Sequence, residues 1–242
     1  MTAQEKSSYR HVLVLGGHKL ATSYAHKITQ AKSKGALFYH DLTLVDPKAN
    51  CEASKTKFAQ DVGIKTQSYA DAIAQAIKAP NLNDEDILIP DHTAKHVLLQ
   101  LYINVAKEQS GKEPSLAKIT KKPDTPFSYQ SEDQTVLALS FATWTCPADC
   151  DEPAICPHTK STRDWEMADK ISDLKKILLS KESKALFHSY ACPSFYEEIC
   201  HIPLTLIRDR VAELKTHLSK NQAPVYVATH SHCHGIVGGI EF

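Results

Sequence analysis

The stretch His11-Val12-Leu13-Val14-Leu15-Gly16-Gly17 decides the fold of the first half of the chain. A short apolar run that ends in glycines is typical of a strand followed by a tight turn. Residues 19–33 then have a composition compatible with a helix, and residues 37–45 contain a second apolar run that Asp46-Pro47 closes. Strands that alternate with helices pair in parallel, so this order predicts an α/β fold.

The same alternation continues along the rest of the chain. Further strands are expected at residues 86–90, 135–143, 185–189 and 225–229, and amphipathic helices at residues 69–78, 94–105, 164–179 and 204–218. Residues 108–126 are rich in Lys, Pro and Ser and lack strong periodicity, which indicates a boundary. We therefore predict a Rossmann-like parallel sheet in residues 1–122, joined to a second α/β domain, rich in βαβ units, in residues 123–242. Packing of both halves as one unit is the alternative.

The composition narrows the classes of partner. Lys plus Arg and Asp plus Glu are balanced at 28 each, so the chain has no overall basic field to attract nucleic acid or anionic lipid. We expect neither nucleic acid nor a membrane as partner, but a small-molecule substrate or a redox partner protein. The polar start of the chain is unlike a secretory signal, and no apolar stretch has the length of a membrane span, which predicts a cytoplasmic protein. In a reducing compartment, clustered cysteines bind metal or perform redox chemistry more often than they form disulfides.

Three of the seven cysteines lie in one loop, Cys146-Pro147-Ala148-Asp149-Cys150-Asp151-Glu152-Pro153-Ala154-Ile155-Cys156-Pro157. Thiolates close in sequence converge on one centre at little cost in loop closure, and proline lowers that cost further. Soft sulfur ligands favour an iron–sulfur cluster or zinc, and we expect a [4Fe-4S] cluster. Zinc is the competing metal, because the spacing from Cys146 to Cys150 suits half a zinc site and His158 offers a nitrogen. Reduced cysteines without a metal are the third reading.

The fourth ligand is expected from another loop at the same edge of a sheet. Cys146, Cys192 and Cys233 each come shortly after an expected strand, and ligands of open α/β sheets bind beyond the carboxyl ends of the strands. Cys233, Cys192 and Cys200 are the candidates. We prefer Cys233, because Gly235 follows it and would permit a close approach of the backbone.

Three histidines surround Cys233. His230, His232 and His234 alternate, so in an extended segment their side chains would share one face. They are our candidate catalytic residues, which would orient a substrate, transfer protons or donate hydrogen bonds to cluster sulfurs. A polar strand end with surface histidines explains the pattern equally well.

The glycine turn of the first half is a candidate nucleotide site. Gly16 and Gly17 begin a segment like the G-x-G-x-x-G fingerprint, but His18 stands in the place of its second glycine. Asp46 is placed like an acid that binds a ribose hydroxyl, although an Asp before Pro47 also favours a turn. A nicotinamide or another nucleotide is therefore a weaker expectation. Asp91 and His92 follow a further strand, and we interpret them and His96 as helix-capping and surface residues.

Residues 12–21 together with Asp46 resemble the nucleotide-binding domains of potassium-uptake regulators of the TrkA type. The combination of this segment with Cys146-Pro147-x2-Cys150, Cys156-Pro157 and Cys233-His234-Gly235 is similar to a poorly characterised group of bacterial proteins, mainly from anaerobes. The resemblance covers most of the chain. It implies a Rossmann-like domain joined to a cysteine-rich iron–sulfur segment, and it implies no particular activity.

Four functions follow from these expectations. The first is a redox enzyme in which a [4Fe-4S] centre exchanges electrons with a small molecule. The second is a non-redox enzyme with three cysteine ligands and an open iron, which acts as a Lewis acid or in sulfur transfer. The third is a redox sensor or electron carrier without catalysis, and the fourth is a structural zinc protein.

Overall fold

The computed structural model describes residues 7–60, 62–90, 96–147, 150, 152–197, 199–220 and 223–242. The chain divides into two compact units, Met1–Lys95 with His201–Arg208, and His96–Cys200 with Asp209–Phe242. The second unit thus begins at His96, so residues 96–122, which the sequence assigned to the first half, lie with the second sheet. Across the described ranges, no helix combines the length and apolar character needed to cross a membrane.

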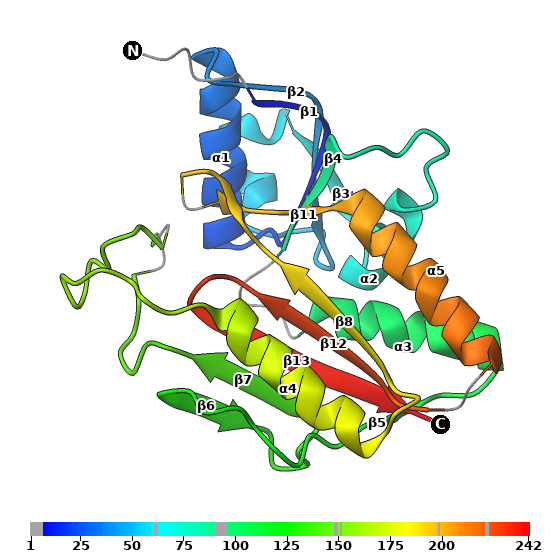
Figure 1. The fold of residues 1–242 in the computed structure, drawn as a ribbon. Helices are drawn as coiled ribbons and strands as arrows, with labels where there is room; N and C mark the ends of the chain where they lie inside the picture. The colour runs from blue at the N-terminus through cyan, green and yellow to red at the C-terminus, as the bar shows by residue number, and fades with distance from the viewer. Residues whose placement is uncertain are drawn as a thin grey trace. The chain divides into compact units, whose positions relative to one another are not determined.

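The first unit is built on a five-stranded sheet with the order β11-β4-β1-β2-β3 (Figure 1). Its strands are β1 (Ser7–Leu15), β2 (Leu37–Asp46), β3 (Gly63–Thr66), β4 (Asp86–Ile89) and β11 (Ile202–Pro203). β1 to β4 pair in parallel, and β11 pairs antiparallel with β4. The helices of this unit are α1 (Lys19–Ser33) and α2 (Tyr69–Ala76), with two 3-10 turns, η1 (Ala53–Lys55) and η2 (Lys57–Gln60).

Continuous apolar runs explain why β1 and β4 are central. Val12 and Val14 have no exposed surface, and all of β4 is buried. A strand covered on both faces reads as an unbroken apolar run, as is usual for parallel sheets with helical crossovers. The predicted first strand, helix and second strand all form, with the helix bounds at Lys19 and Ser33.

The second unit contains a mixed sheet with the order β6-β7-β13-β12-β8, with β5 paired to β13. Its strands are β5 (Ser115–Leu116), β6 (Phe127–Gln130), β7 (Val136–Ser140), β8 (Leu186–Ala191), β12 (Val225–His230) and β13 (His234–Glu241). A separate hairpin consists of β9 (Ser194–Tyr196) and β10 (Ile199–Cys200). The helices are α3 (Val97–Ser110), α4 (Met167–Lys181) and α5 (Leu204–Lys220), of which α5 begins within the segment assigned to the first unit.

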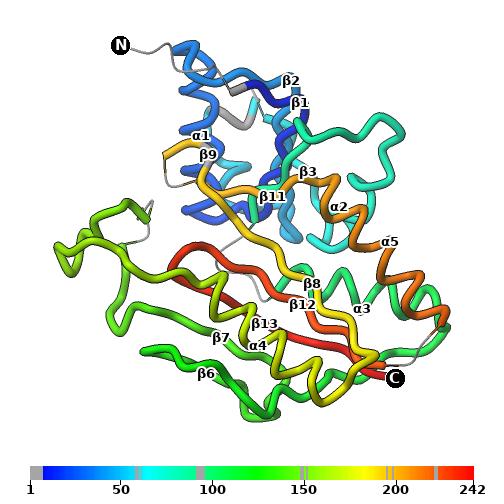
Figure 2. The backbone as a smooth tube through the Cα atoms, in the orientation of Figure 1, coloured from blue at the N-terminus to red at the C-terminus, as the bar shows by residue number. Residues whose placement is uncertain are grey.

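The direction of the strands brings three carboxyl ends to one edge of this sheet. β8 and β12 are parallel, and β13 is antiparallel to both β12 and β7. β7, β8 and β12 therefore run in the same direction, as their arrows in Figure 1 show, and Figure 2 traces the same backbone as a tube. The α/β class is confirmed, but among the described strands of this sheet the expected parallel pairing is found only between β8 and β12. The predicted strand β7 pairs antiparallel with β6 and with β13, and β13 is a strand that the sequence did not predict. Three glycines lower the strand propensity of that segment.

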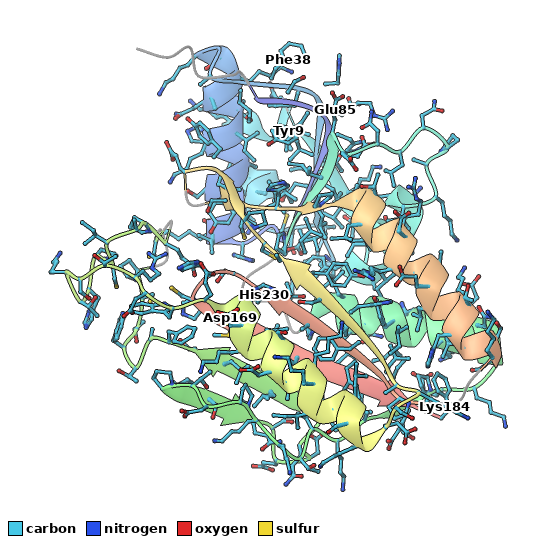
Figure 3. The ribbon with its side chains drawn as sticks, viewed as in Figure 1. Tyr9, Phe38, Glu85, Asp169, Lys184 and His230 are labelled. Atoms are coloured by element: carbon cyan, nitrogen blue, oxygen red, sulfur yellow. The ribbon has the colours of Figure 1, made fainter. Side chains whose placement is uncertain are left out.

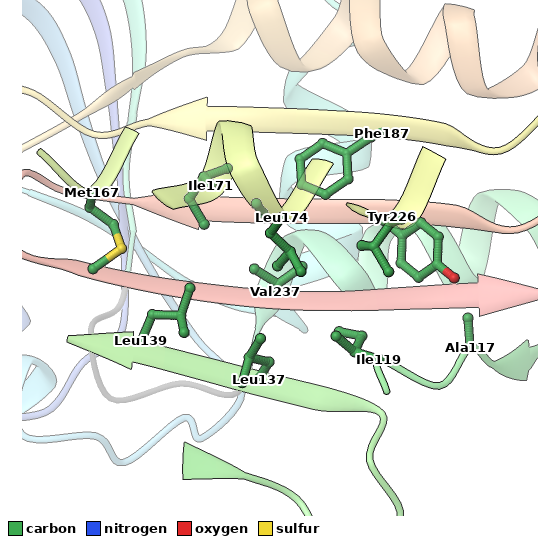
Figure 4. Close-up of a cluster of buried hydrophobic side chains, with 12 residues drawn as sticks. Ala117, Ile119, Leu137, Leu139, Met167, Ile171, Leu174, Phe187, Tyr226 and Val237 are labelled. Carbon is green, nitrogen blue, oxygen red and sulfur yellow. The ribbon is translucent and has the colours of Figure 1, made fainter. Parts of the chain in front are cut away.

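One apolar core lies between α4 and this sheet (Figure 4). Met167, Ile171, Leu174 and Leu178 recur at helical spacing on the buried face of α4. They pack with side chains from the sheet and the segment before it, namely Ala117, Ile119, Leu137, Leu139, Phe187, Tyr226, Ala228 and Val237. At about 25 cal/mol per Å² of buried apolar surface, such a cluster is a principal source of stability for the unit.

A hydrogen-bonded network occupies the other face of β8. His188 and Tyr190 alternate with the core residue Phe187, so they point away from α4. The hydroxyl of Tyr102 on α3 lies 2.5 Å from His188 Nδ1 and 2.9 Å from the Tyr190 hydroxyl. His188 Nε2 lies 3.0 Å from a carboxylate oxygen of Glu213 on α5. Each buried polar group of this network thus has a partner, as burial requires.

Candidate cysteine-rich metal site

The hairpin between β12 and β13 is the centre of the candidate site. β12 ends at His230, β13 begins at His234, and the backbone N–H of Ser231 donates to His234 O at 2.9 Å. Three neighbours donate backbone N–H groups to this hairpin: Phe141 after β7, Cys192 after β8 and Met167 at the start of α4. Figure 3 labels His230 and Asp169 at this end of the unit. The loops that follow β7, β8 and β12 therefore meet, as the sequence predicted.

The cysteine loop brings its thiols near the hairpin. Burial raises the pKa of Cys146, and the neighbouring thiols of Cys150 and Cys156 raise it further. Burial raises the pKa of Cys233 to about 11, and Cys146 contributes to that increase. Cys146 is thus the cysteine whose charge acts on the thiol of Cys233, and the charges of Cys150 and Cys156 act on Cys146.

Cys156 lies in a turn that favours its thiolate. The backbone N–H of Thr159 is the main group that lowers its pKa, and burial opposes this effect. The hydroxyl of Thr159, the backbone N–H of His158 and the charge of Arg163 lower it further. Hydrogen bonds to a thiolate stabilise the charged form, which is the form that binds metals. A small hairpin holds this turn, since Cys156 N donates to Ser161 O at 2.9 Å.

Two indole rings place N–H donors beside the thiols. Trp165 Nε1 donates to Cys233 Sγ at 3.3 Å, and its ring stacks on Phe141. Trp144 Nε1 is buried without a hydrogen bond of normal geometry in the described chain, yet it lies near Cys146 and lowers its pKa. Both donors are of the kind that surrounds the sulfurs of metal centres. The sequence reasoning did not single out either tryptophan, although Trp144 directly precedes the cysteine loop.

Glu152 connects the cysteine loop to the hairpin, and the sequence reasoning missed it. Its carboxylate accepts hydrogen bonds from Ser231 Oγ at 2.7 Å, from His232 N at 2.8 Å and from Cys233 N at 3.3 Å. Burial alone would raise the pKa of Glu152, but bonds from His234, Ser231 and His232 outweigh it, so the pKa lies below its ordinary value. Glu152 also has a φ of 52°, a conformation that costs free energy for any residue with a Cβ.

The three histidines do not share one strand face. His230 ends β12, His232 lies in the turn and His234 begins β13, because the chain reverses between them. His232 Nδ1 lies 2.9 Å from a carboxylate oxygen of Glu166, and His234 Nδ1 lies 3.2 Å from Glu152. His230 is buried, which lowers its pKa. His232 and His234 are thus oriented by carboxylates, whereas His230 is a buried strand end.

The donor set fits a soft metal centre, but the side chains are not closed around one. Within the described residues, no three His, Cys, Asp or Glu side chains form a group that could hold a metal ion. Asp149 and Asp151 of the cysteine loop lie outside the described residues. Gly235, expected to admit a close backbone approach to the site, instead faces α4, because a Cβ there would lie 3.2 Å from Met167 Cγ.

Cys192 and Cys200 form a second thiol pair at this end of the sheet. Both are buried, and the nearby thiol of Cys200 is the main cause of the raised pKa of Cys192. The charge of Glu152 contributes to the same increase. Cys200 is thus the group that acts most strongly on the pKa of Cys192.

The glycine turn of the first unit is filled by its own chain. Gly16 has a φ of 97°, and Gly17 N donates to Asp46 Oδ2 at 2.6 Å. Asp46 Oδ1 accepts a second backbone bond from Lys48 N at 2.7 Å, as in an Asx-turn. A Cβ on Gly17 would lie 2.5 Å from Cys51 Sγ, so Cys51 packs directly against this turn.

The remaining candidates of the first half have different outcomes. Asp91 and His92 lie outside the described residues. His96 is buried rather than on the surface, because its Nε2 lies 2.9 Å from Val227 O, and burial lowers its pKa to about 4. An open pocket of about 530 Å³ lies along α1, β1 and β2, and its lining residues do not include Gly16, Gly17 or Asp46.

Comparison with known proteins gives one family. No curated protein and no solved structure matches the chain. The model of a family described as "Uncharacterized protein, C-terminal domain" matches residues 93–242. This match includes the mixed sheet, the cysteine loop and the β12–β13 hairpin. The chain belongs to the family that this C-terminal domain defines.

Proposed function

We propose that the second unit binds a [4Fe-4S] cluster through Cys146, Cys150, Cys156 and Cys233, and that the protein is a cytoplasmic redox enzyme acting on a small molecule. The observation that carries the proposal is the contact between the cysteine loop and the hairpin: the carboxylate of Glu152, which lies between Cys150 and Cys156 in the sequence, accepts from the backbone N–H groups of His232 at 2.8 Å and Cys233 at 3.3 Å. Soft sulfur ligands in a buried setting with N–H donors favour iron–sulfur chemistry.

The residues around the cysteines have distinct tasks in this proposal. A bound cluster supplies one-electron transfer. Glu152 holds the hairpin against the cysteine loop by accepting from Ser231 Oγ and from the backbone of His232 and Cys233. Glu166 and Glu152 contact Nδ1 of His232 and of His234 and so orient the two imidazole rings. Nε2 of each ring can then accept a proton from a substrate.

The other functions differ in the use of Cys233. If Cys233 does not bind iron, three cysteines leave one iron open for Lewis-acid or sulfur-transfer chemistry. A non-catalytic sensor or electron carrier needs the cluster but no proton transfer by His232 or His234. For structural zinc, His158 would complete the set, and its ring stacks on Trp144 with 4.4 Å between ring centroids. A Rossmann-like first unit that binds a nicotinamide or another nucleotide also stays a proposal, supported by the parallel strands β1 to β4.

Metal and sulfide analysis of anaerobically purified protein tests the centre. We expect about four iron and four sulfide per chain, with the optical and magnetic spectra of a [4Fe-4S] cluster. One zinc without iron would leave only the structural zinc function. Cys233→Ala should then lower the iron content, and Cys51→Ala is the matched control, since Cys51 is also buried but contacts Gly17. Full iron content in Cys233→Ala would favour the open-iron enzyme.

Trp165→Phe tests whether Cys233 is a ligand without removing it. The change keeps the aromatic ring that stacks on Phe141 but removes the N–H donor to Cys233 Sγ. Loss of a hydrogen bond to a ligand sulfur makes the cluster harder to reduce. We therefore expect a lower midpoint potential at unchanged iron content. An unchanged potential would contradict ligation by Cys233.

A further inference from the structure

The Cys192–Cys200 pair is separate from the cysteine loop and has its own geometry. Cys192 follows the last residue of β8, and Cys200 ends β10 of the short hairpin β9–β10. In that hairpin Cys200 is opposite Ser194, with an irregular register beside it. The chain therefore leaves and returns at nearly the same place, and both cysteines are buried at the base of this hairpin. The Cys200 thiol is also the first cause of the raised pKa of Cys192. A loop of seven residues separates them, 193–199.

The pair also borders the centre of the candidate site. Cys192 N donates to His230 O at 2.8 Å, which fixes its backbone against the end of β12. Glu152, which binds the backbone of Cys233, is close enough for its charge to act on the Cys192 thiol. Both thiols are almost fully buried, with exposed fractions of 7% for Cys192 and 5% for Cys200. Bulk solvent therefore has little access to either thiol, whereas the β12–β13 hairpin lies directly beside Cys192.

We propose that Cys192 and Cys200 are a redox-active dithiol that cycles between two thiols and an intramolecular disulfide. In the oxidising direction, one thiolate attacks the sulfur–sulfur bond of a partner disulfide and forms a mixed disulfide. The second thiolate then displaces the partner, so that the Cys192–Cys200 bond forms and the partner leaves as two thiols. The partner gains the two electrons and two protons that the pair loses. The substrate class is therefore a thiol or disulfide compound.

The short chain segment between the two cysteines favours disulfide formation over metal binding. Two buried thiols at the base of one short hairpin need little backbone movement to reach disulfide geometry, and closing so small a loop costs little entropy. A metal ion is a poorer match, since soft-metal sites use four ligands, and across the described ranges no three His, Cys, Asp or Glu side chains form a group that could hold a metal ion. The dithiol also gives the proposed cluster a two-electron acceptor or donor. That electronic connection rests on the proposed function, whereas the dithiol itself does not.

Redox titration of the full chain tests the dithiol. The protein is equilibrated anaerobically with mixtures of reduced and oxidised dithiothreitol, quenched with acid and alkylated, and its peptides are analysed by mass spectrometry. We expect the linked Cys192–Cys200 peptide to rise from a minor to the major form over about a hundredfold change in the ratio, as for any two-electron couple. Cys192→Ala should abolish this peptide and leave Cys200 open to alkylation. Cys51, buried to the same 7% as Cys192, should be alkylated in every mixture.

Two results would overturn the proposal. One is a protein in which Cys192 and Cys200 are alkylated in every mixture, as Cys51 is. The other is a linked peptide that appears only when urea unfolds the chain. Cys146→Ala separates this proposal from the cluster, because it should lower the iron content and leave the dithiol titration in place. If native protein lacks iron but still titrates at Cys192 and Cys200, the cluster proposal fails and the dithiol stands.

Discussion

Removal of the Glu152 carboxylate should loosen the hairpin from the cysteine loop. Glu152 accepts from Ser231 Oγ, from two backbone N–H groups and from the ring of His234, with a side chain only 18% exposed. A hydrogen bond to a charged group contributes about 1.5–3 kcal/mol, but water replaces part of what is lost and such bonds are not additive. We expect Glu152→Ala to lower the free energy of unfolding by about 2–4 kcal/mol.

The backbone of Glu152 permits a second, sharper comparison. At its φ of 52°, alanine keeps the steric cost of a Cβ, whereas glycine does not. Glu152→Gly loses the same hydrogen bonds but should be about 1 kcal/mol more stable than Glu152→Ala. Because the pKa of Glu152 is lowered in the folded state, its contribution is full above the unfolded pKa of about 4.3 and is lost as the pH falls through the folded pKa. The difference between wild type and variant should therefore shrink in acid.

Urea unfolding at neutral and acidic pH measures both effects. Glu166→Ala is the matched control, because Glu166 is paired with His232 at 2.9 Å but is 53% exposed, so its loss should cost less than about 1 kcal/mol. Equal losses for Glu152→Ala and Glu166→Ala, or a Glu152→Gly variant less stable than Glu152→Ala, would refute the role given to this carboxylate.

Three further predictions concern the rest of the fold. Gly17→Ala should destabilise the first unit by about 1–3 kcal/mol, because its Cβ would lie 2.5 Å from Cys51 Sγ. Cys51→Ala in the same chain should restore part of this loss. If the effects of the two substitutions on the free energy of unfolding simply add, the contact is contradicted. Tyr102→Phe should cost about 1–3 kcal/mol in urea unfolding, since it leaves buried partners unpaired, and a neutral effect would show that the network contributes nothing. Burial lowers the pKa values of His96 and His188 to about 4 in the folded chain, so the unfolded chain binds more protons between about pH 6.5 and 4. The free energy of unfolding should therefore fall as the pH decreases over that range. A free energy of unfolding that does not change with pH there would count against the burial of these histidines.

The cysteine loop could be recognised from the sequence because its information is local. Three thiols within eleven residues, stiffened by prolines, indicate a candidate metal site before any tertiary structure is known. The position of Cys233 could also be anticipated, since it required only that β7, β8 and β12 run in one direction. The sequence did not indicate that an antiparallel β13 lies between them. Gly238 and Gly239 weaken the strand pattern of that segment. Glycine is needed at both positions, because Leu99 and Tyr226 occupy the space that a Cβ would fill.

Much of the order of strands and helices, and the residue types that make the cysteine loop a candidate metal site, can be read from the sequence alone, because periodicity and residue type act over a few neighbours. Only the tertiary structure decided which groups the loop meets. Glu152 and Ser231 are 79 residues apart, and no local pattern records that one binds the other. The pairing of Cys192 with Cys200 likewise depends on the β9–β10 hairpin. Long-range hydrogen bonds and the direction of strands arise only when the whole sheet forms, so they also decide which cysteines act together.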